Sequence, residues 1–377
     1  MTEEKANNLL REKEEQIFTS ERGRVIYAAV VPKKGSEIAY QIEIGIKTPD
    51  ETFLFDTLSE EFPDELLRVG IPEQIIANYK NIKRRKGTDV NLIADFGRAE
   101  RNFIKLGSPF VDRVNQDIFD MLGFPSVKDD NDEKASKITF SGGFEFLGQC
   151  SEYPNERHNV YNKICGGISI SDIERRHTAG TLGCLFSLQN SNEVYGITNS
   201  HVLPYADFEA NKGIAHPALM DSRTSKPKRV IGELMAKWDK NIFDVAIFKL
   251  TKPETPMGIF AIGVGQEGFE IGAAEIGQVS GKSGRTTSVT WGNVLSKNAV
   301  VNLRNGRFMR DLILTDTYSD CGDSGSVLYT DEQEVIGLIF GRSMKSKRVF
   351  AIKMENIFNC GHKLIDGTEI IIDKFLT

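Results

Sequence analysis

Apolar positions in the first third of the chain follow a helical spacing in some places and alternate with polar positions in others. The spacing predicts a helix over residues 3–18 and strands over residues 25–31 and 38–46. The proline, glycine and serine between these strands, within residues 32–36, predict a hairpin turn. Beyond them the pattern predicts helices over residues 63–79, 96–106 and 111–122 and a short strand over residues 90–94. We therefore predict a small α+β unit at the start of the chain.

A different pattern begins near residue 166, where short apolar runs are separated by glycine and polar turns. These runs predict strands over residues 181–188, 194–198, 230–234, 245–250, 275–279, 289–295, 312–315, 326–329, 335–340 and 349–353. Because no amphipathic helix is predicted between them, the pattern favours an all-β sandwich or barrel. The 34 glycines of the chain are typical of such a turn-rich fold.

The two patterns are separated by a polar stretch, residues 128–134, that contains no apolar side chain. Such a stretch is typical of a linker, and 377 residues suffice for two domains of roughly 100–200 residues each. We predict an N-terminal α+β domain over residues 1–135, a linker and lead-in over residues 136–163, and a β domain over residues 164–377.

The charge and the cysteine content of the chain indicate which binding partners and which cellular compartment to expect. The 47 basic and 53 acidic residues give a net charge of -6, so we expect neither nucleic acid nor an anionic membrane as a partner. No apolar run approaches the roughly 20 residues of a membrane span, and the charged start does not resemble a secretory signal. The five cysteines are sparse and odd in number, which fits reduced thiols. We expect a cytoplasmic protein.

Three short segments of the β region carry the residue types of nucleophilic catalysis. His201 follows an apolar strand, Asp244 stands at the start of another, and Ser324 lies among small residues in the segment 320–326. Acyl transfer by a serine needs a histidine to take the hydroxyl proton and a carboxylate to orient that histidine. Because Gly322 has no Cβ, the backbone N–H groups of Gly322 and Ser324 are suited to form an oxyanion hole. The segments predict a catalytic triad of His201, Asp244 and Ser324.

The same segments resemble the trypsin-like, or chymotrypsin-fold, serine proteases, in which histidine, aspartate and serine follow one another in this order. The resemblance covers residues 164–360. Segments 166–170, 179–183, 199–202 and 281–287 look most similar to intracellular bacterial members and to plant relatives of the narrow-leaf type. The resemblance implies two six-stranded β-barrels with the triad in the cleft between them. It also implies a serine endopeptidase that cleaves a protein or peptide substrate and requires no cofactor.

The resemblance also places a specificity pocket. Tyr318 would lie near the base of this pocket, and Phe340 and Gly341 would lie on the wall that pairs with the substrate backbone. An aromatic residue at the base argues against a simple acidic pocket for lysine or arginine. Asp320 would still supply a negative charge nearby, so the preferred substrate residue stays open.

Activation has two alternatives, which differ in the partner of Asp323. In secreted relatives this aspartate pairs with a new amino terminus, and cleavage after Lys163 would make residues 1–163 a pro-domain. Alternatively, residues 166–170 are an uncut lead-in strand, and an internal cation such as Arg175 or Arg176 pairs with Asp323. The uncut form is favoured because reduced, cytosolic relatives are not usually zymogens of this kind.

Other motifs do not indicate a cofactor or a metal. Glycine patterns at residues 263–268 and 277–283 resemble nucleotide-binding loops, but the sequence after each is strand-like where a helix is required. The histidines at positions 158, 177 and 216 lack the spacing of a zinc site.

Two alternatives to a protease remain open. One is a pseudo-protease, a binding module that keeps the fold without turnover, and the other is an esterase or acyl transferase that uses the same site. Because the N-terminal domain contributes no triad residue, we expect it to regulate the enzyme, with a partner protein, or to recruit its substrate.

Overall fold

The structure of the chain is a computed structural model. Of the first 155 residues it describes segments 2–20, 25–32, 39–46, 90–94 and 144–146. It describes residues 156–376 apart from 175–178, 190, 205, 210–211, 223–225, 239–242, 252–255, 265–267, 304–306, 344–347 and 359. The helices predicted over 63–79, 96–106 and 111–122 and the linker over 128–134 lie outside the described residues, so the domain boundary at 135 stays a prediction.

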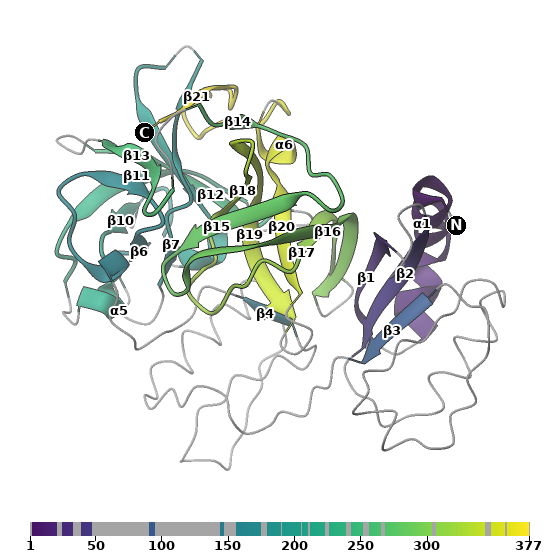
Figure 1. The fold of residues 1–377 in the computed structure, drawn as a ribbon. Coiled ribbons are helices and arrows are strands. Elements are labelled where there is room, and N and C mark those ends of the chain that lie inside the picture. The colour runs from purple at the N-terminus through teal and green to yellow at the C-terminus, as the bar shows by residue number, and fades with distance from the viewer. Residues whose placement is uncertain are drawn as a thin grey trace, which may run out of the picture.

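The start of the chain forms a helix and a hairpin, as predicted. Helix α1 (Glu3–Ser20) is followed by strands β1 (Val25–Pro32) and β2 (Tyr40–Ile46), which pair antiparallel. The predicted short strand is β3 (Val90–Ala94), which lies parallel to β2. This α+β unit is the purple and blue part of Figure 1.

The N-terminal hairpin is joined to the β region through main-chain and ionic contacts. Strand β1 continues a large sheet by pairing with β16 (Ser288–Leu303), where Tyr27 lies opposite Val301. The buried Glu43 carboxylate accepts two hydrogen bonds from the Arg348 guanidinium, at 3.0 and 2.9 Å. A bidentate pair of this kind fixes orientation as well as distance, so the hairpin is anchored to the β region in one geometry.

The first half of the β region is an eight-stranded, barrel-like sheet. Its spatial order is β21 (Ile372–Leu376), β8 (Leu185–Leu188), β9 (Val194–Thr198), β12 (Val245–Leu250), β11 (Val230–Trp238), β10 (Gly213–Ala215), β6 (Ser169–Asp172) and β7 (Gly180–Thr181). Ile170, Leu234 and Phe248 belong to the apolar cluster that fills it. The short strands β5 (Ile164–Gly166) and β13 (Pro256–Ala261) pair beside it.

The second half is a closed barrel. Strands β15 (Val279–Gly284), β18 (Val327–Thr330), β19 (Glu334–Ser343), β20 (Val349–Lys353), β17 (Arg307–Thr315) and β16 follow one another, and pairing of β15 with β16 closes the ring. Two short strands, β4 (Phe144–Phe146) and β14 (Glu270–Ile271), also pair with β19. The predicted double-barrel fold is therefore confirmed, with the N-terminal unit attached to the second barrel (Figure 1). The first sheet has eight described strands where six are expected.

The remaining described elements are short helical turns: η1 (Glu156–His158), η2 (Ser200–Val202), α5 (Leu219–Ser222) and α6 (Met354–Ile357). Among the described residues, no helix combines the length and apolarity needed to cross a membrane.

Two strand predictions need correction. Residues 275–279 were predicted as a strand, but Gly277 has a φ of +88° and Gln278 N–H donates to the Glu275 carbonyl, so the chain turns before β15 begins. Residues 181–188 were predicted as one strand and are split between β7 and β8. The split arises because Leu182 and Gly183 donate to the carbonyls of Ile168 and Ile197 instead of continuing one ladder.

Candidate active site

His201 and Asp244 form a buried, directed pair in the first barrel. Strand β9 ends at Thr198, and the turn η2 carries His201 beside the start of β12, where Asp244 lies. His201 Nδ1 is 2.5 Å from Asp244 Oδ2, and the His201 backbone N–H donates to Oδ1 at 3.1 Å. Asn199 Nδ2 donates to the Asp244 carbonyl at 2.7 Å. A carboxylate facing Nδ1 places the proton on that nitrogen and leaves the Nε2 lone pair to act as a base.

Ser324 lies on a tight loop that packs against the end of β9. A Cβ on Gly325, whose φ is +92°, would lie 2.2 Å from Thr198 Oγ1. A Cβ on Gly180 would lie 2.4 Å from the Val202 side chain and 3.0 Å from the Ser324 carbonyl. The two glycines therefore allow the serine loop to approach the histidine turn closely. The Ser324 hydroxyl donates to the Phe340 carbonyl at 3.2 Å.

The loop before Ser324 is held by side chains on both sides. The Cys321 carbonyl accepts from Thr286 Oγ1 at 2.6 Å, and the Gly322 carbonyl accepts from Thr181 Oγ1 at 2.8 Å. Because a trans peptide directs its N–H opposite to its carbonyl, the Gly322 N–H points away from Thr286. Main-chain donors fixed before a substrate arrives are what an oxyanion hole requires.

We expect Gly322→Ala to displace the Gly322 N–H and so to lower kcat. The φ of Gly322 is +97°, and a Cβ there would lie 2.3 Å from Thr286 Oγ1 and 2.5 Å from Arg285 Nη1. Loss of one oxyanion donor lowers kcat by about 10²–10³-fold, which steady-state peptide hydrolysis would measure. Gly277→Ala is the matched control, because Gly277 has a φ of +88° and nothing within 4 Å of an added Cβ. A kcat equally reduced in both variants would contradict a role for loop geometry.

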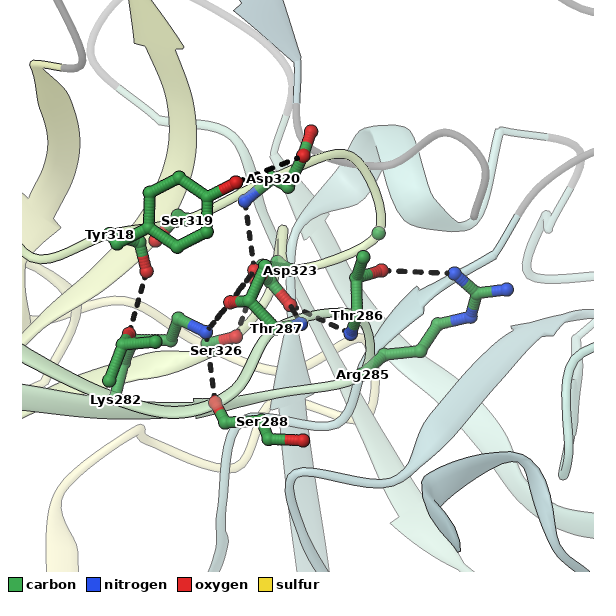
Figure 2. A network of polar contacts seen from close by, with 12 residues as sticks. Lys282, Arg285, Thr286, Thr287, Ser288, Tyr318, Ser319, Asp320, Asp323 and Ser326 are labelled. Carbon is green, nitrogen blue, oxygen red and sulfur yellow. Dashed lines mark hydrogen bonds and ion pairs between the residues drawn. The ribbon is translucent and has the colours of Figure 1, made fainter. Parts of the chain in front are cut away.

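Asp323 is buried beneath the loop and paired with Lys282 of β15. Lys282 Nζ lies 3.2 Å from Asp323 Oδ2, with both side chains fully buried. The carboxylate also accepts from Thr286 N at 2.8 Å, Thr287 Oγ1 at 2.6 Å and Asp320 N at 2.9 Å. Figure 2 shows these groups converging on Asp323. Burial alone would raise the pKa of Asp323, but Lys282 and the hydrogen-bond donors outweigh it and hold the pKa below the ordinary value.

The uncut alternative expects an internal cation beside Asp323, and the structure shows one. Arg175 and Arg176, the cations proposed from sequence, lie outside the described residues, and the cation found beside Asp323 is Lys282. Lys163 is exposed, whereas Ile164 is buried in β5 and pairs with Pro256 of β13.

A second buried cluster supports the same loop from the first barrel. Arg285 Nε donates to Asp221 Oδ2 at 2.8 Å, and Arg285 N donates to Thr181 Oγ1 at 2.9 Å. His158 Nδ1 lies 3.6 Å from Asp221 Oδ1. Burial, followed by the charge of Arg285, lowers the pKa of His158 to about 4, so this histidine is neutral near pH 7. The cluster was not predicted, because no local motif indicates a contact between residues so far apart in sequence.

The predicted pocket residues gather beside the serine loop. Tyr318 is exposed, and its hydroxyl lies 3.5 Å from Asp320 Oδ2. Asp320 Oδ1 accepts from Arg342 Nη2 at 3.0 Å, so its charge is compensated by a residue that sequence reasoning missed. Phe340 is buried, and Gly341 follows it in β19. Among the described residues, no cluster of histidine, cysteine, aspartate or glutamate is suited to hold a metal ion.

Two barrel-like β-sheets, a buried His–Asp pair at the end of one strand, and a serine on a glycine-rich loop that packs against the same strand are features of the trypsin-like class of protein. Residues 182–338 match the family described as "Trypsin-like peptidase domain". The resemblance to trypsin-like serine proteases is therefore confirmed over this part of the chain.

Individual relatives are distant or partial. Streptogrisin-D of Streptomyces griseus is 38% identical over 74 residues, which span 20% of this chain and 19% of that protein. A glutamic acid specific serine protease covers 52% of this chain and 95% of its own, with 21% identity and a TM-score of 0.42. Thermobifida fusca protease A covers 52% of this chain and 94% of its own, with 18% identity and a TM-score of 0.39.

Proposed function

We propose that the chain is a serine endopeptidase in which Ser324 attacks the peptide carbonyl and forms an acyl-enzyme. His201 takes the hydroxyl proton through Nε2 and then delivers it to the leaving amine, while Asp244 orients the ring and stabilises the imidazolium. The Gly322 and Ser324 N–H groups bind the oxyanion. For the first step, the Ser324 hydroxyl turns from the Phe340 carbonyl toward His201.

The observation that carries this proposal is the His201–Asp244 pair beside the serine loop. Its 2.5 Å contact is buried, and the His201 backbone N–H holds the Asp244 carboxylate through Oδ1. The Asn199 side chain fixes the backbone of Asp244 by donating to its carbonyl. A structural histidine needs no such directed carboxylate, whereas a general base does. The compensated charge of Asp320 gives the pocket no excess negative charge, so we propose no preference for a basic substrate residue.

Labelling with a fluorophosphonate probe, followed by peptide hydrolysis, tests the proposal. The probe reacts with an activated serine, so we expect wild type to be labelled and both Ser324→Ala and His201→Ala to remain unlabelled. Failure to label wild type would favour the binding-module alternative. Labelling with hydrolysis of small esters but not of peptides would favour the esterase alternative.

We also propose that the enzyme acts without cleavage after Lys163. The support is that Asp323 already has a buried ammonium partner, so a new amino terminus at Ile164 is not needed to neutralise it. We expect Lys163→Ala to retain wild-type kcat/KM, and the mass of active wild type to include residues 1–163. An inactive Lys163→Ala variant, or an active wild-type species that begins at Ile164, would contradict this.

We propose that the N-terminal unit regulates the protease, because the Glu43–Arg348 pair ties it to the second barrel at the residue just before β20. A cytoplasmic location stays a prediction from composition.

A further inference from the structure

Strand β4 lies on one edge of β19, a few residues beyond the serine loop. It pairs antiparallel, with Phe146 opposite Gly341, Glu145 opposite Arg342 and Phe144 opposite Ser343. The other edge of β19 is taken by β20, which pairs with Gly341 and Arg342. Figure 1 shows β4 at the lower end of this sheet. Residues 341–342 of β19 are therefore paired on both sides.

The serine loop and β4 follow one another along the same edge. Strand β18 pairs with β19 as far as Leu338. Gly325 N–H then donates to the Ile339 carbonyl at 2.9 Å, and the Ser324 hydroxyl donates to the Phe340 carbonyl at 3.2 Å. Strand β4 begins its pairing at the next residue, Gly341. An extended peptide that leaves Ser324 along this edge would occupy the place where β4 lies.

The direction of β4 is also that of a bound substrate. Residue numbers in β4 rise as those in β19 fall, so β4 runs toward Phe340 and Ser324 in its amino-to-carboxyl direction. A peptide that presents its scissile carbonyl to Ser324, with its acyl half on this edge, must run the same way. The segment thus matches the acyl half of a substrate in edge, pairing and polarity.

We infer that residues 144–146 occupy the peptide-binding edge of β19 as an intramolecular competitor of an extended polypeptide substrate. The inference rests on the proposed function, because it assumes that Ser324 acts on peptides. Strand addition supplies main-chain hydrogen bonds independent of sequence. A tethered segment competes at an effective concentration of about millimolar. A segment in place about nine-tenths of the time raises the apparent KM for a peptide about tenfold.

The pairing identifies the backbone group to test. Ser343 N–H donates to the Arg348 carbonyl at 2.7 Å, so it faces β20 and away from β4. The main-chain N–H and C=O groups of successive residues in an antiparallel strand point to opposite edges. Because those of Ser343 face β20, those of Arg342 face Glu145 of β4. The Glu145 N–H therefore belongs to the ladder, whereas that of Phe144 faces away. Proline at 145 removes a ladder bond, and proline at 144 serves as the matched control.

The test compares Glu145→Pro and Phe144→Pro with wild type in the full chain. We expect Glu145→Pro to lower KM for a peptide substrate about tenfold with little change in kcat, and Phe144→Pro to leave KM near the wild-type value. Hydrogen exchange on wild type provides a readout without substitution. A saturating peptide boronate directed at Ser324 is expected to speed amide exchange in residues 144–146.

Unchanged KM in Glu145→Pro, together with unchanged exchange in 144–146 on binding the boronate, would overturn the inference. Fluorophosphonate labelling separates this failure from failure of the proposed function. Normal labelling of Ser324 in both variants with no change in KM rejects only the competitor. Absence of labelling and of peptide hydrolysis in every form rejects the protease itself.

Discussion

Replacing Ser324 with alanine is expected to lower kcat for peptide hydrolysis by about 10⁶-fold, and His201→Ala is expected to do the same. In the proposed mechanism the hydroxyl and the imidazole act as one unit, so removal of either leaves the other without its reaction partner. For the same reason the Ser324→Ala/His201→Ala double variant should be no slower than either single variant. Steady-state kinetics with one peptide substrate, supported by burst measurements on wild type, would give these rates.

Ser326→Ala is the matched control for that prediction. Ser326 is a buried serine two residues from Ser324, but its hydroxyl donates to the Asp323 carbonyl at 2.5 Å. We expect its loss to weaken the loop and to reduce kcat by no more than about tenfold, the effect of one neutral hydrogen bond. If the kcat reductions of Ser324→Ala and His201→Ala multiply in the double variant, the two residues act independently. That result would contradict a triad.

The parts of the fold that follow from local pattern could be predicted from the sequence. Strands at 194–198, 245–250 and 349–353 were predicted with the bounds that the structure gives, because each is a short apolar run bounded by polar or glycine residues. His201, Asp244 and Ser324 form a candidate triad in the sequence because each stands beside such a run, in a fixed order. These signals are contained in segments of fewer than about ten residues.

The parts that depend on contacts between distant segments could not be predicted. Lys282 looks like one polar residue in a strand of small ones, and only the closed barrel brings it against Asp323. Arg285 meets Asp221 across 64 positions, and β4 meets β19 across almost 200, with no local pattern to indicate either partner. The sequence indicated that Asp323 needs a cation, but the choice among cations required the fold.

Breaking the Lys282–Asp323 pair is expected to lower the free energy of unfolding strongly. Lys282→Met removes the ammonium and leaves a charged carboxylate where both side chains are fully buried. Removal of one partner of a buried ion pair lowers the free energy of unfolding by about 3–5 kcal/mol. The loop that carries Gly322 also loses its anchor, so kcat should fall as well. Urea unfolding monitored by fluorescence would measure the stability change.

The pH dependence of Lys282→Met provides a sharper test than the size of the loss. In wild type the pKa of Asp323 lies below its ordinary value. The stability that this carboxylate contributes is therefore fully present above the unfolded pKa of about 3.9, and it is lost only as pH falls through the lower folded pKa. Without the ammonium, burial raises the pKa of Asp323 above that of the unfolded chain. The folded variant then binds more protons than the unfolded chain, so its stability should rise relative to wild type as pH falls from 7 toward 5.

The double variant Lys282→Met/Asp323→Asn isolates the charge from the packing. It removes both charges, and replacement of a whole buried pair by neutral groups is often close to neutral in stability. We therefore expect the double variant to be more stable than Lys282→Met at pH 7. Its stability should no longer rise relative to wild type as pH falls from 7 toward 5. Both effects are expected even though the asparagine cannot accept hydrogen bonds from all the donors that hold Asp323. If the double variant is as unstable as Lys282→Met at every pH, the unpaired charge of Asp323 is not the cause of the loss, and the lysine contributes mainly through the bonds it donates to Thr287 and the Ser288 carbonyl.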